Sequence, residues 1–180
     1  MSEMSPVDEA LPAVRKLLRD AAVPFRIVGG LAVHHHGWQR FTEDVDVVVD
    51  AAALDRLDEA LPAHGFVRES KSRIRHQPTG VRVDVLVSGT PLARRPEVSF
   101  PRPQDIEPSP QDPEVAALRP LVWLKLLAGR RRDETDVVEL LKRVDDGVYL
   151  ELEAGLPADL RPLVAQLRDE ALEELRFEQP

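Results

Sequence analysis

Two spacings of hydrophobic residues alternate along the first half of the chain. Apolar residues recur every three or four positions, which is typical of helices, in residues 7–22, 31–36 and 51–64. Short runs rich in Val and Ile, which favour extended backbone, predict strands at residues 25–28, 45–49 and 81–87. Strands that alternate with helices indicate an α/β unit.

Prolines interrupt this alternation between Gly89 and Pro113. Because proline can neither donate to a sheet nor sit inside a helix, this segment is predicted to be an extended connection, with an edge strand at residues 98–100. Helical spacing then returns at residues 121–128, 133–144 and 159–177. We therefore expect an α/β fold with a small mixed sheet flanked by helices (residues 1–105) and a helical C-terminal subdomain packed on it (residues 106–180).

Composition narrows the classes of function. The 180 residues suffice for a domain with a core, and aromatic residues are only 4%, so that core must consist of Val, Leu and Ala. Cysteine is absent, which excludes disulfides, thiolate zinc sites and a cysteine nucleophile. The net charge of −8 disfavours a broad electrostatic surface for nucleic acid, although residues 130–132 form a local basic patch.

The sequence predicts neither a secretory signal peptide nor a transmembrane segment. Its N-terminal residues lack a basic start followed by an apolar run, and no stretch is apolar for 18 consecutive residues. We expect a cytoplasmic protein with no membrane contact.

Candidate chemistry begins with three aspartates. Asp44 and Asp46 lie two residues apart at the start of a strand, so their carboxylates share one face. Asp84 lies in the third predicted strand, and if the two strands are neighbours the three carboxylates converge. Because such a cluster repels itself, it suits Mg²⁺ or Mn²⁺, and a two-metal site would serve phosphoryl transfer.

A Gly29–Gly30 pair ends the first predicted strand. Without Cβ atoms, a phosphate can approach this backbone closely, and the helix that follows offers unpaired N–H groups. A nucleoside triphosphate is therefore expected to lie between the glycine turn and the metals.

These residues resemble the core of the DNA polymerase β-like nucleotidyltransferase superfamily. The resemblance rests on IVGGLAVHHHGWQRFTEDVDVVV, with its glycine turn and acidic pair, and on VRVDVLV, which carries the third acid. Arg40 and Thr42, in the form R-x-T-x-D-x-D, resemble the minimal and AbiEii-type nucleotidyltransferases and also small antibiotic nucleotidyltransferases. One departure is Gly30, where many relatives carry a serine whose hydroxyl contacts phosphate.

A second stretch, LVWLKLLAGRRRDETDVVELL, resembles a helical segment of AbiEii-like toxin enzymes. The resemblance implies that Lys125 reaches the nucleotide phosphates and that Arg132, Asp133 and Asp136 lie near the pocket. Arg40 is expected to position the strand or a phosphate and not to perform chemistry.

Simpler interpretations exist for each motif. The acidic pair is also typical of a half-exposed strand end, Asp84 could pair with Arg40 or Arg75, and Lys125 could be a structural lysine. Residues 34–36 are three histidines, which point about 100° apart on a helix and cannot face one metal. One of these imidazoles is expected near the nucleotide base.

Together these observations predict a metal-dependent nucleotidyltransferase that moves a nucleoside monophosphate from an NTP to a hydroxyl and releases pyrophosphate. Asp44, Asp46 and Asp84 are the expected catalytic and metal-binding residues, and Gly29, Gly30, Arg40 and Lys125 the expected nucleotide-binding residues. The resemblance points to a toxin-like enzyme that modifies tRNA or protein, with an antitoxin or a second copy as partner. The alternatives are an antibiotic nucleotidyltransferase and a non-catalytic nucleotide-binding or toxin–antitoxin partner of the same fold.

Overall fold

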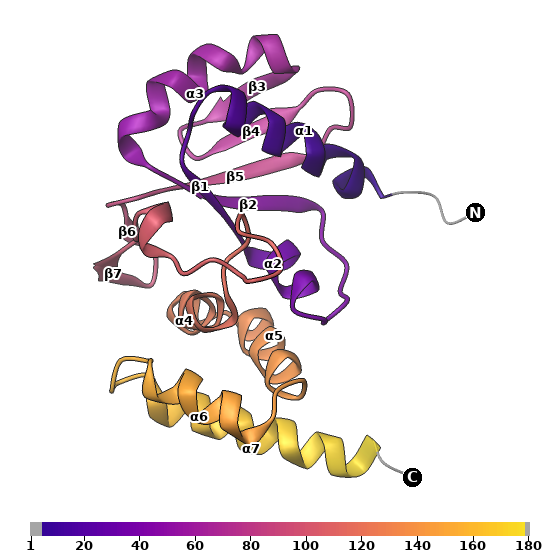
Figure 1. Ribbon diagram of the computed structural model, residues 1–180, viewed down its shortest axis with the longest axis vertical. Coiled ribbons are helices and arrows are strands. Elements are labelled where there is room, and N and C mark those ends of the chain that lie inside the picture. Colours follow the sequence, from indigo (N-terminus) through magenta and orange to yellow (C-terminus); the bar gives the residue numbers. More distant parts are fainter. Residues whose placement is uncertain (1–4, 179–180) are drawn as a thin grey trace.

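The structure is a computed structural model that describes residues 5–178 (Figure 1). Its α-helices are α1 (Pro6–Asp20), α2 (Gly29–His35), α3 (Leu54–Ala60), α4 (Leu118–Ala128), α5 (Arg131–Leu141), α6 (Asp146–Ala154) and α7 (Arg161–Glu178). Its strands are β1 (Phe25–Val28), β2 (Asp44–Val49), β3 (Phe66–Ser70), β4 (Arg73–His76), β5 (Arg82–Val87), β6 (Pro91–Leu92) and β7 (Arg95–Ser99). Short 3-10 turns occupy Ala51–Ala53, Pro62–His64 and Pro103–Asp105.

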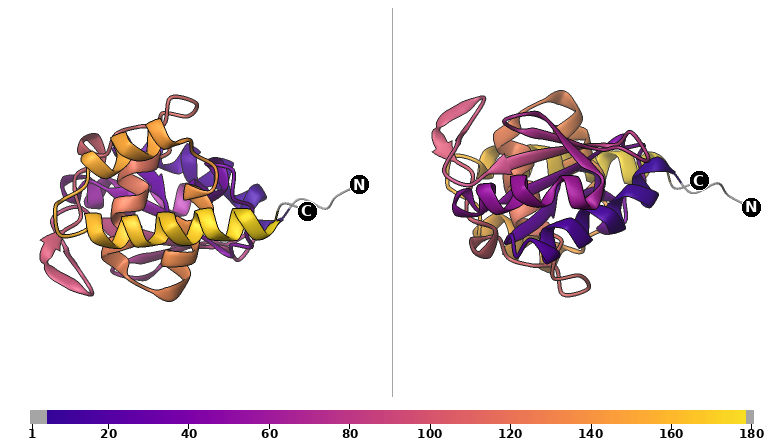
Figure 2. Two further views of the ribbon diagram at one scale, coloured as in Figure 1. Left: turned by 90° about the horizontal axis from the view of Figure 1, so that it is seen from below. Right: turned by 90° about the horizontal axis from the view of Figure 1, so that it is seen from above.

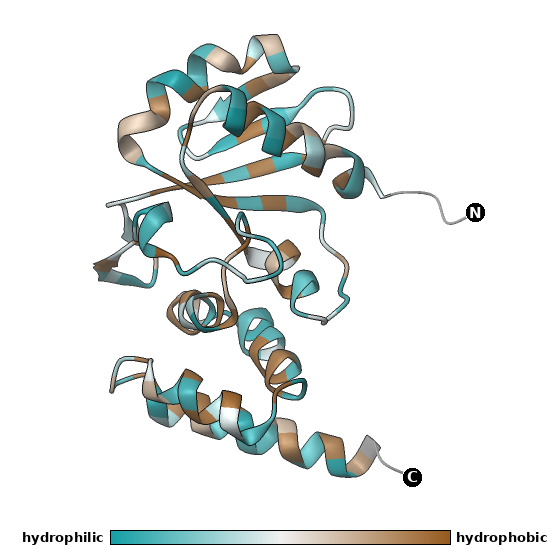
Figure 3. Ribbon diagram, in the orientation of Figure 1, coloured by the Kyte–Doolittle hydropathy of each residue, from teal (hydrophilic) through white to brown (hydrophobic). Residues whose placement is uncertain are grey.

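A five-stranded sheet with the order β1-β2-β5-β4-β3 forms the centre of the molecule. The β2–β5 pair is parallel and the other neighbours are antiparallel, which confirms the predicted α/β class with a small mixed sheet. The parallel pair needs a crossover, and α3 together with the β3–β4 hairpin provides it. Brown and teal residues alternate along the two central strands in Figure 3, as expected for strands with one apolar and one polar face.

The sequence analysis missed β3 and β4. These strands carry charged side chains at Arg68, Glu69, Arg73 and Arg75, and the hairpin buries few large apolar groups. A polar strand of this kind is stabilised by its pairing with a neighbour, a contact that periodicity within the segment does not reveal.

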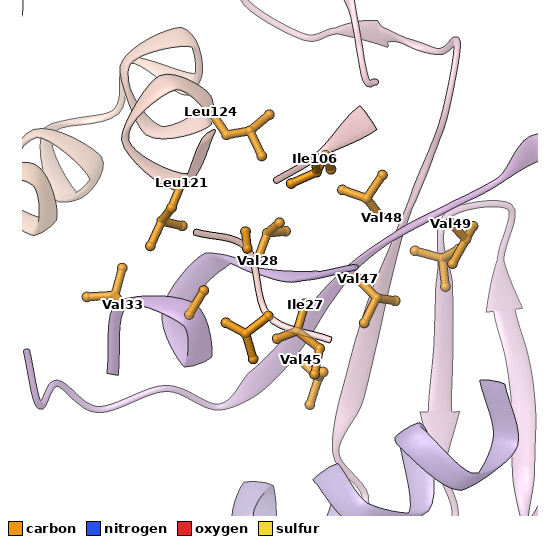
Figure 4. Close-up of a cluster of buried hydrophobic side chains, with 14 of the residues drawn as sticks. Ile27, Val28, Val33, Val45, Val47, Val48, Val49, Ile106, Leu121 and Leu124 are labelled. Carbon is orange, nitrogen blue, oxygen red and sulfur yellow. The ribbon is translucent and has the colours of Figure 1, made fainter. Parts of the chain in front are cut away.

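Helices cover both sides of the sheet. The helices α1 and α3 pack against each other at one end of the molecule, and the C-terminal helices lie at the opposite end, as the two views in Figure 2 show. The short helix α2 contacts β1, β2 and α4, and so joins the sheet to the C-terminal part. Figure 4 shows Leu121 and Leu124 of α4 in one apolar cluster with Val28 and Ile106.

The proline-rich connection is extended, as predicted, but it also forms structure of its own. Its first part folds into the β6–β7 hairpin, which is separate from the main sheet and contains most of the predicted edge strand. The residues that directly follow it, 114–116, run beside the outer strand β1, where Ile27 donates to the carbonyl of Glu114 and accepts from the N–H of Ala116. This segment therefore protects the open edge of the sheet.

The C-terminal part is helical, as predicted. The helices α4, α5 and α7 match the predicted helices within a few residues, and Gly129 ends α4 in the left-handed conformation. The helix α6 was missed, and Asp145 begins it by accepting from the N–H of Val148. The proposed boundary between residues 105 and 106 stays a prediction.

Within residues 5–178, no helix combines the length and the apolar character that crossing a membrane requires.

Candidate active site

The register of β2 against β5 brings the three aspartates together. Asp46 pairs directly with Asp84, so their Cα atoms are about 5 Å apart across neighbouring strands. Asp44 lies two residues before Asp46 on the same face. All three carboxylates line one pocket of about 300 Å³, so the predicted convergence is present.

The glycine turn lies directly beside this cluster. Val28, the last residue of β1, pairs with Asp46, and the chain then turns into α2 through Gly29, whose φ is +64°. A Cβ atom at Gly29 would lie 1.8 Å from Oδ2 of Asp46, and the N–H of Gly30 donates to the Asp46 side chain. Only glycine allows the turn and the carboxylate to approach this closely.

Arg40 and Thr42 cover the second glycine. A Cβ at Gly30 would lie 2.7 Å from the Thr42 hydroxyl and 2.8 Å from an Arg40 nitrogen. The Thr42 hydroxyl also donates to Oδ1 of Asp44 at 3.3 Å. A threonine hydroxyl therefore lies beside the second glycine of the turn.

The three carboxylates oppose one another electrostatically. The pKa of Asp46 is raised to about 6, mainly by burial and then by the charges of Asp44 and Asp84, which together outweigh the lowering by Lys125 and the Gly30 N–H. An oxygen-only donor set with this repulsion fits a hard divalent cation, which would stabilise the ionised form of all three groups. No group of three His, Asp or Glu side chains in residues 5–178 is already arranged to hold a metal ion.

Each of the three carboxylates accepts a hydrogen bond from another group of the protein. Asp84 forms an ion pair with Arg73, whose Nε lies 2.7 Å from its Oδ1. The sequence analysis considered Arg40 or Arg75 as the partner of Asp84, and both suggestions are wrong because Arg73 is its direct neighbour on β4. The simpler interpretation of Asp84 as a paired strand residue therefore holds alongside its place in the pocket.

Lys125 lines the pocket, but its ammonium group is paired with two buried aspartates of α5. Its Nζ lies 3.0 Å from Oδ1 of Asp133 and 2.6 Å from Oδ2 of Asp136, and all three side chains are at most 5% exposed. Arg40 contacts the same Asp136 at 2.8 Å, and Arg130 contacts Asp133. This buried cluster connects α4, α5 and the loop before β2.

Charge within the cluster favours the ionised form of Asp133. Burial by itself would raise the pKa of Asp133, but hydrogen bonds and charges from Arg130 and Lys125 outweigh burial and lower that pKa. In this conformation Lys125 acts on the pocket through its field, which lowers the pKa of Asp46.

The pocket also has a basic wall and apolar lining groups. The positive groups are Arg94, Arg130 and Arg132, all largely exposed. The apolar groups are Leu86, Leu92, Phe100, Leu121, Leu124 and Leu127. Sequence reasoning missed Arg94, which reaches the pocket because the β6–β7 hairpin folds back over α4, where it donates to the carbonyl of Gly129 at 2.5 Å. Its signal was the Arg94–Arg95 pair in the proline-rich segment.

The predicted site residues therefore share one region. Gly29, Arg40, Asp44, Asp46, Asp84 and Lys125 line the pocket, and Gly30 contacts it through its N–H. Arg132 and Asp133 also line it, whereas Asp136 lies behind Lys125.

The histidines do not reach the pocket. His35 is 2.8 Å from the hydroxyl of Ser109, and His36 is 2.8 Å from the carbonyl of Ala116. No histidine among the described residues lines the pocket, so the prediction of an imidazole near the base is wrong. These side chains instead hold α2 against the segment that runs beside β1.

Comparison with known proteins gives weak likenesses. No protein-family model matches the chain, and no curated protein sequence does. The crystal structure of ANT(2″)-Ia in complex with adenylyl-2″-tobramycin is 14% identical with a TM-score of 0.48, over 93% of this chain and 97% of that one. The solution structure of the antibiotic-resistance factor ANT(2″)-Ia is 13% identical with a TM-score of 0.44, over 94% and 88%. The chemistry of this chain therefore has to follow from its own site.

Proposed function

We propose that this protein transfers a nucleoside monophosphate from an NTP to an acceptor hydroxyl and releases pyrophosphate. The observation that carries the proposal is the placement of Asp44, Asp46 and Asp84 against a strict glycine turn in one pocket. Two elements far apart in the sequence meet there in the pattern that the resemblance to polymerase β-like nucleotidyltransferases anticipates.

A divalent cation fits the donor set. Asp44 and Asp46 would hold it, and Asp84 would complete the acceptor side. When bound, Mg²⁺ or Mn²⁺ supplies Lewis acidity toward the phosphates and offsets the charge that develops during transfer.

The chain's own residues account for the other steps. Gly29 brings the backbone of the turn to the pocket beside Asp46, where we expect the triphosphate, and Arg94, Arg130 and Arg132 in the pocket lining stabilise its negative charge. The acceptor oxygen forms a bond to the α-phosphorus while the bond from that phosphorus to the bridging oxygen breaks. The hydroxyl proton passes to Asp84, and pyrophosphate leaves.

The basic wall of the pocket, formed by Arg94, Arg130 and Arg132, affects which class of acceptor can bind. Three arginines at the pocket rim attract phosphate-bearing groups and repel a polycationic drug. We therefore favour tRNA or protein, in the manner of a toxin, over an aminoglycoside-like acceptor. The alternative to an enzyme is a non-catalytic nucleotide-binding or toxin–antitoxin partner of the same fold. The presence of all three aspartates favours the enzyme.

The test is a label-transfer assay. The purified protein is incubated with Mg²⁺ and each α-labelled NTP in turn, together with total tRNA, cell extract or an aminoglycoside mixture. Label in RNA or protein supports the toxin-like function, and label in the drug supports the alternative. No transfer to any acceptor, with the protein folded, would favour a non-catalytic member of the fold.

Two variants control the assay. The double variant Asp44→Asn/Asp46→Asn removes the expected cation ligands and should abolish transfer. Asp50→Asn changes the charge at the end of the same strand, outside the pocket, and keeps a side chain able to accept from the Ala52 N–H. It should retain full activity, and transfer by the double variant would refute the catalytic assignment.

A further inference from the structure

Asp84 differs from the other two carboxylates in the kind of donor it accepts. The Thr42 hydroxyl and the Gly30 N–H, which reach Asp44 and Asp46, are neutral. Asp84 accepts a charge-assisted bond from Arg73 at 2.7 Å, and such bonds are about twice as strong as neutral ones. The carboxylate oxygen that faces Arg73 is therefore already engaged.

Arg73 is placed to hold Asp84 and also to leave it. It lies on β4 directly opposite Asp84 on β5, so the contact follows from the sheet register and not from a mobile loop. Its side chain is 42% exposed, so it can change rotamer without leaving a cavity.

A second acidic group, Glu69, acts on Arg73 through its charge. Glu69 on the neighbouring strand β3 contacts Arg75 at 2.7 Å, and its charge contributes to the raised pKa of Arg73. Arg73 is thus held by a pocket carboxylate, Asp84, and attracted by a second carboxylate outside the pocket, Glu69.

We propose that Arg73 is a positioning residue that competes with the divalent cation for Asp84. In the cation-free protein it neutralises Asp84 and turns it toward β4. When a cation binds between the carboxylates, Asp84 rotates toward it and Arg73 moves toward Glu69. This inference rests on the proposed function, because it concerns the cation that the proposed chemistry uses.

The test measures Mn²⁺ binding to the full chain without nucleotide or acceptor, by calorimetry and by the EPR signal of free Mn²⁺. Arg73→Gln removes the competitor and should bind Mn²⁺ about two- to fivefold more tightly than the unchanged protein, the range an exposed ion pair allows. Arg73→Lys keeps the charge but loses the guanidinium geometry, so its affinity should lie between the two.

Arg75→Gln is the matched control. Arg75 is on the same strand and face, is 48% exposed, and pairs with Glu69 instead of a pocket carboxylate. Because this change leaves Arg73 on Asp84 and only frees Glu69, its gain in Mn²⁺ affinity should be smaller than that of Arg73→Gln. In an Asp84→Asn background, Arg73→Gln should no longer change the affinity, because the group for which they compete is gone.

Several results would overturn the inference. Equal or weaker Mn²⁺ binding by folded Arg73→Gln, or an equal gain in Arg75→Gln, would show that Arg73 does not compete for the site. If Arg73→Gln failed to fold, Mn²⁺ affinity of Arg73→Lys equal to that of the unchanged protein would overturn it. Failure of the proposed function is distinguishable, since it would appear as an unchanged protein that binds no Mn²⁺ or transfers no label.

Discussion

At the scale of single residues, Gly29 is the position where the backbone and the site depend on each other most directly. Its positive φ and its contact with Asp46 exclude any side chain. Gly80 has a similar φ of +74°, but a Cβ there would meet nothing within 4 Å. Comparing substitutions at Gly29 and Gly80 therefore separates the cost of the left-handed backbone conformation from the cost of displacing the Asp46 carboxylate.

We therefore expect Gly80→Ala to lower the free energy of unfolding by about 1 kcal/mol, the cost of a left-handed alanine. Gly29→Ala should lower it by about 3 kcal/mol or more and abolish transfer, because Asp46 must move. Urea unfolding of both variants gives the comparison. Equal losses would show that Asp46 is not pressed against the turn.

Asp46 should make stability depend on pH. Its pKa of about 6 in the folded state exceeds the value near 4 expected in the unfolded chain, so the folded state binds the proton first as pH falls. Between about pH 6 and pH 4, protonation of Asp46 therefore adds stability, and above about pH 6 the charged form destabilises the cation-free protein.

Asp46→Asn removes this charge and tests the sign. In the presence of EDTA it should be more stable than the unchanged protein near pH 7.5, and the difference should shrink toward about pH 5. The control is Asp50→Asn, because the Ala52 N–H and Gln104 lower the pKa of Asp50, so its effect has the opposite sign. A difference that does not change with pH would contradict the assignment.

At the scale of elements, the Lys125 cluster joins two helices and the loop before β2. Removing a buried partner leaves uncompensated charge, so Lys125→Met should cost about 3 kcal/mol in the free energy of unfolding. Lys16→Met removes an exposed lysine from an i,i+4 pair with Asp20 and should cost little. Urea unfolding measures both changes.

This comparison also tests the role of Lys125. A loss of transfer together with a loss of stability agrees with a structural lysine whose charge acts on Asp46 from a distance. Full stability with lost transfer would instead show that Lys125 leaves Asp133 and Asp136 to contact the phosphates directly.

At the scale of the whole molecule, the C-terminal part completes the core of the sheet. The segment after residue 105 pairs with β1, and Leu121 and Leu124 pack on the apolar cluster that includes Val28 and Ile106 (Figure 4). The basic wall of the pocket also comes largely from this part.

A fragment of residues 1–105 should therefore not fold cooperatively. It lacks the partner of Ile27 and exposes Val28 and Val48, which Ile106, Leu121 and Leu124 cover in the full chain, to water. Circular dichroism during heating should show a broad transition for the fragment and a sharp one for the full chain. A sharp transition of the fragment would establish residues 1–105 as an independent domain.

Local spacing was enough to predict much of the site. The interval between Asp44 and Asp46 places both on one face because side chains alternate along a strand, and the glycine pair after β1 required a tight turn. The helices α1, α4, α5 and α7 followed from their apolar periodicity. All of these features depend on contacts between residues near one another in the chain.

Pairing between distant segments was decided only by the tertiary structure. Which residue faces Asp84 depends on strand register, so Arg73 replaced the partners that the sequence suggested. Lys125 has two buried aspartates within reach only after α4 and α5 pack together. The polar strands β3 and β4 are stabilised by their neighbours, which periodicity within a segment does not register.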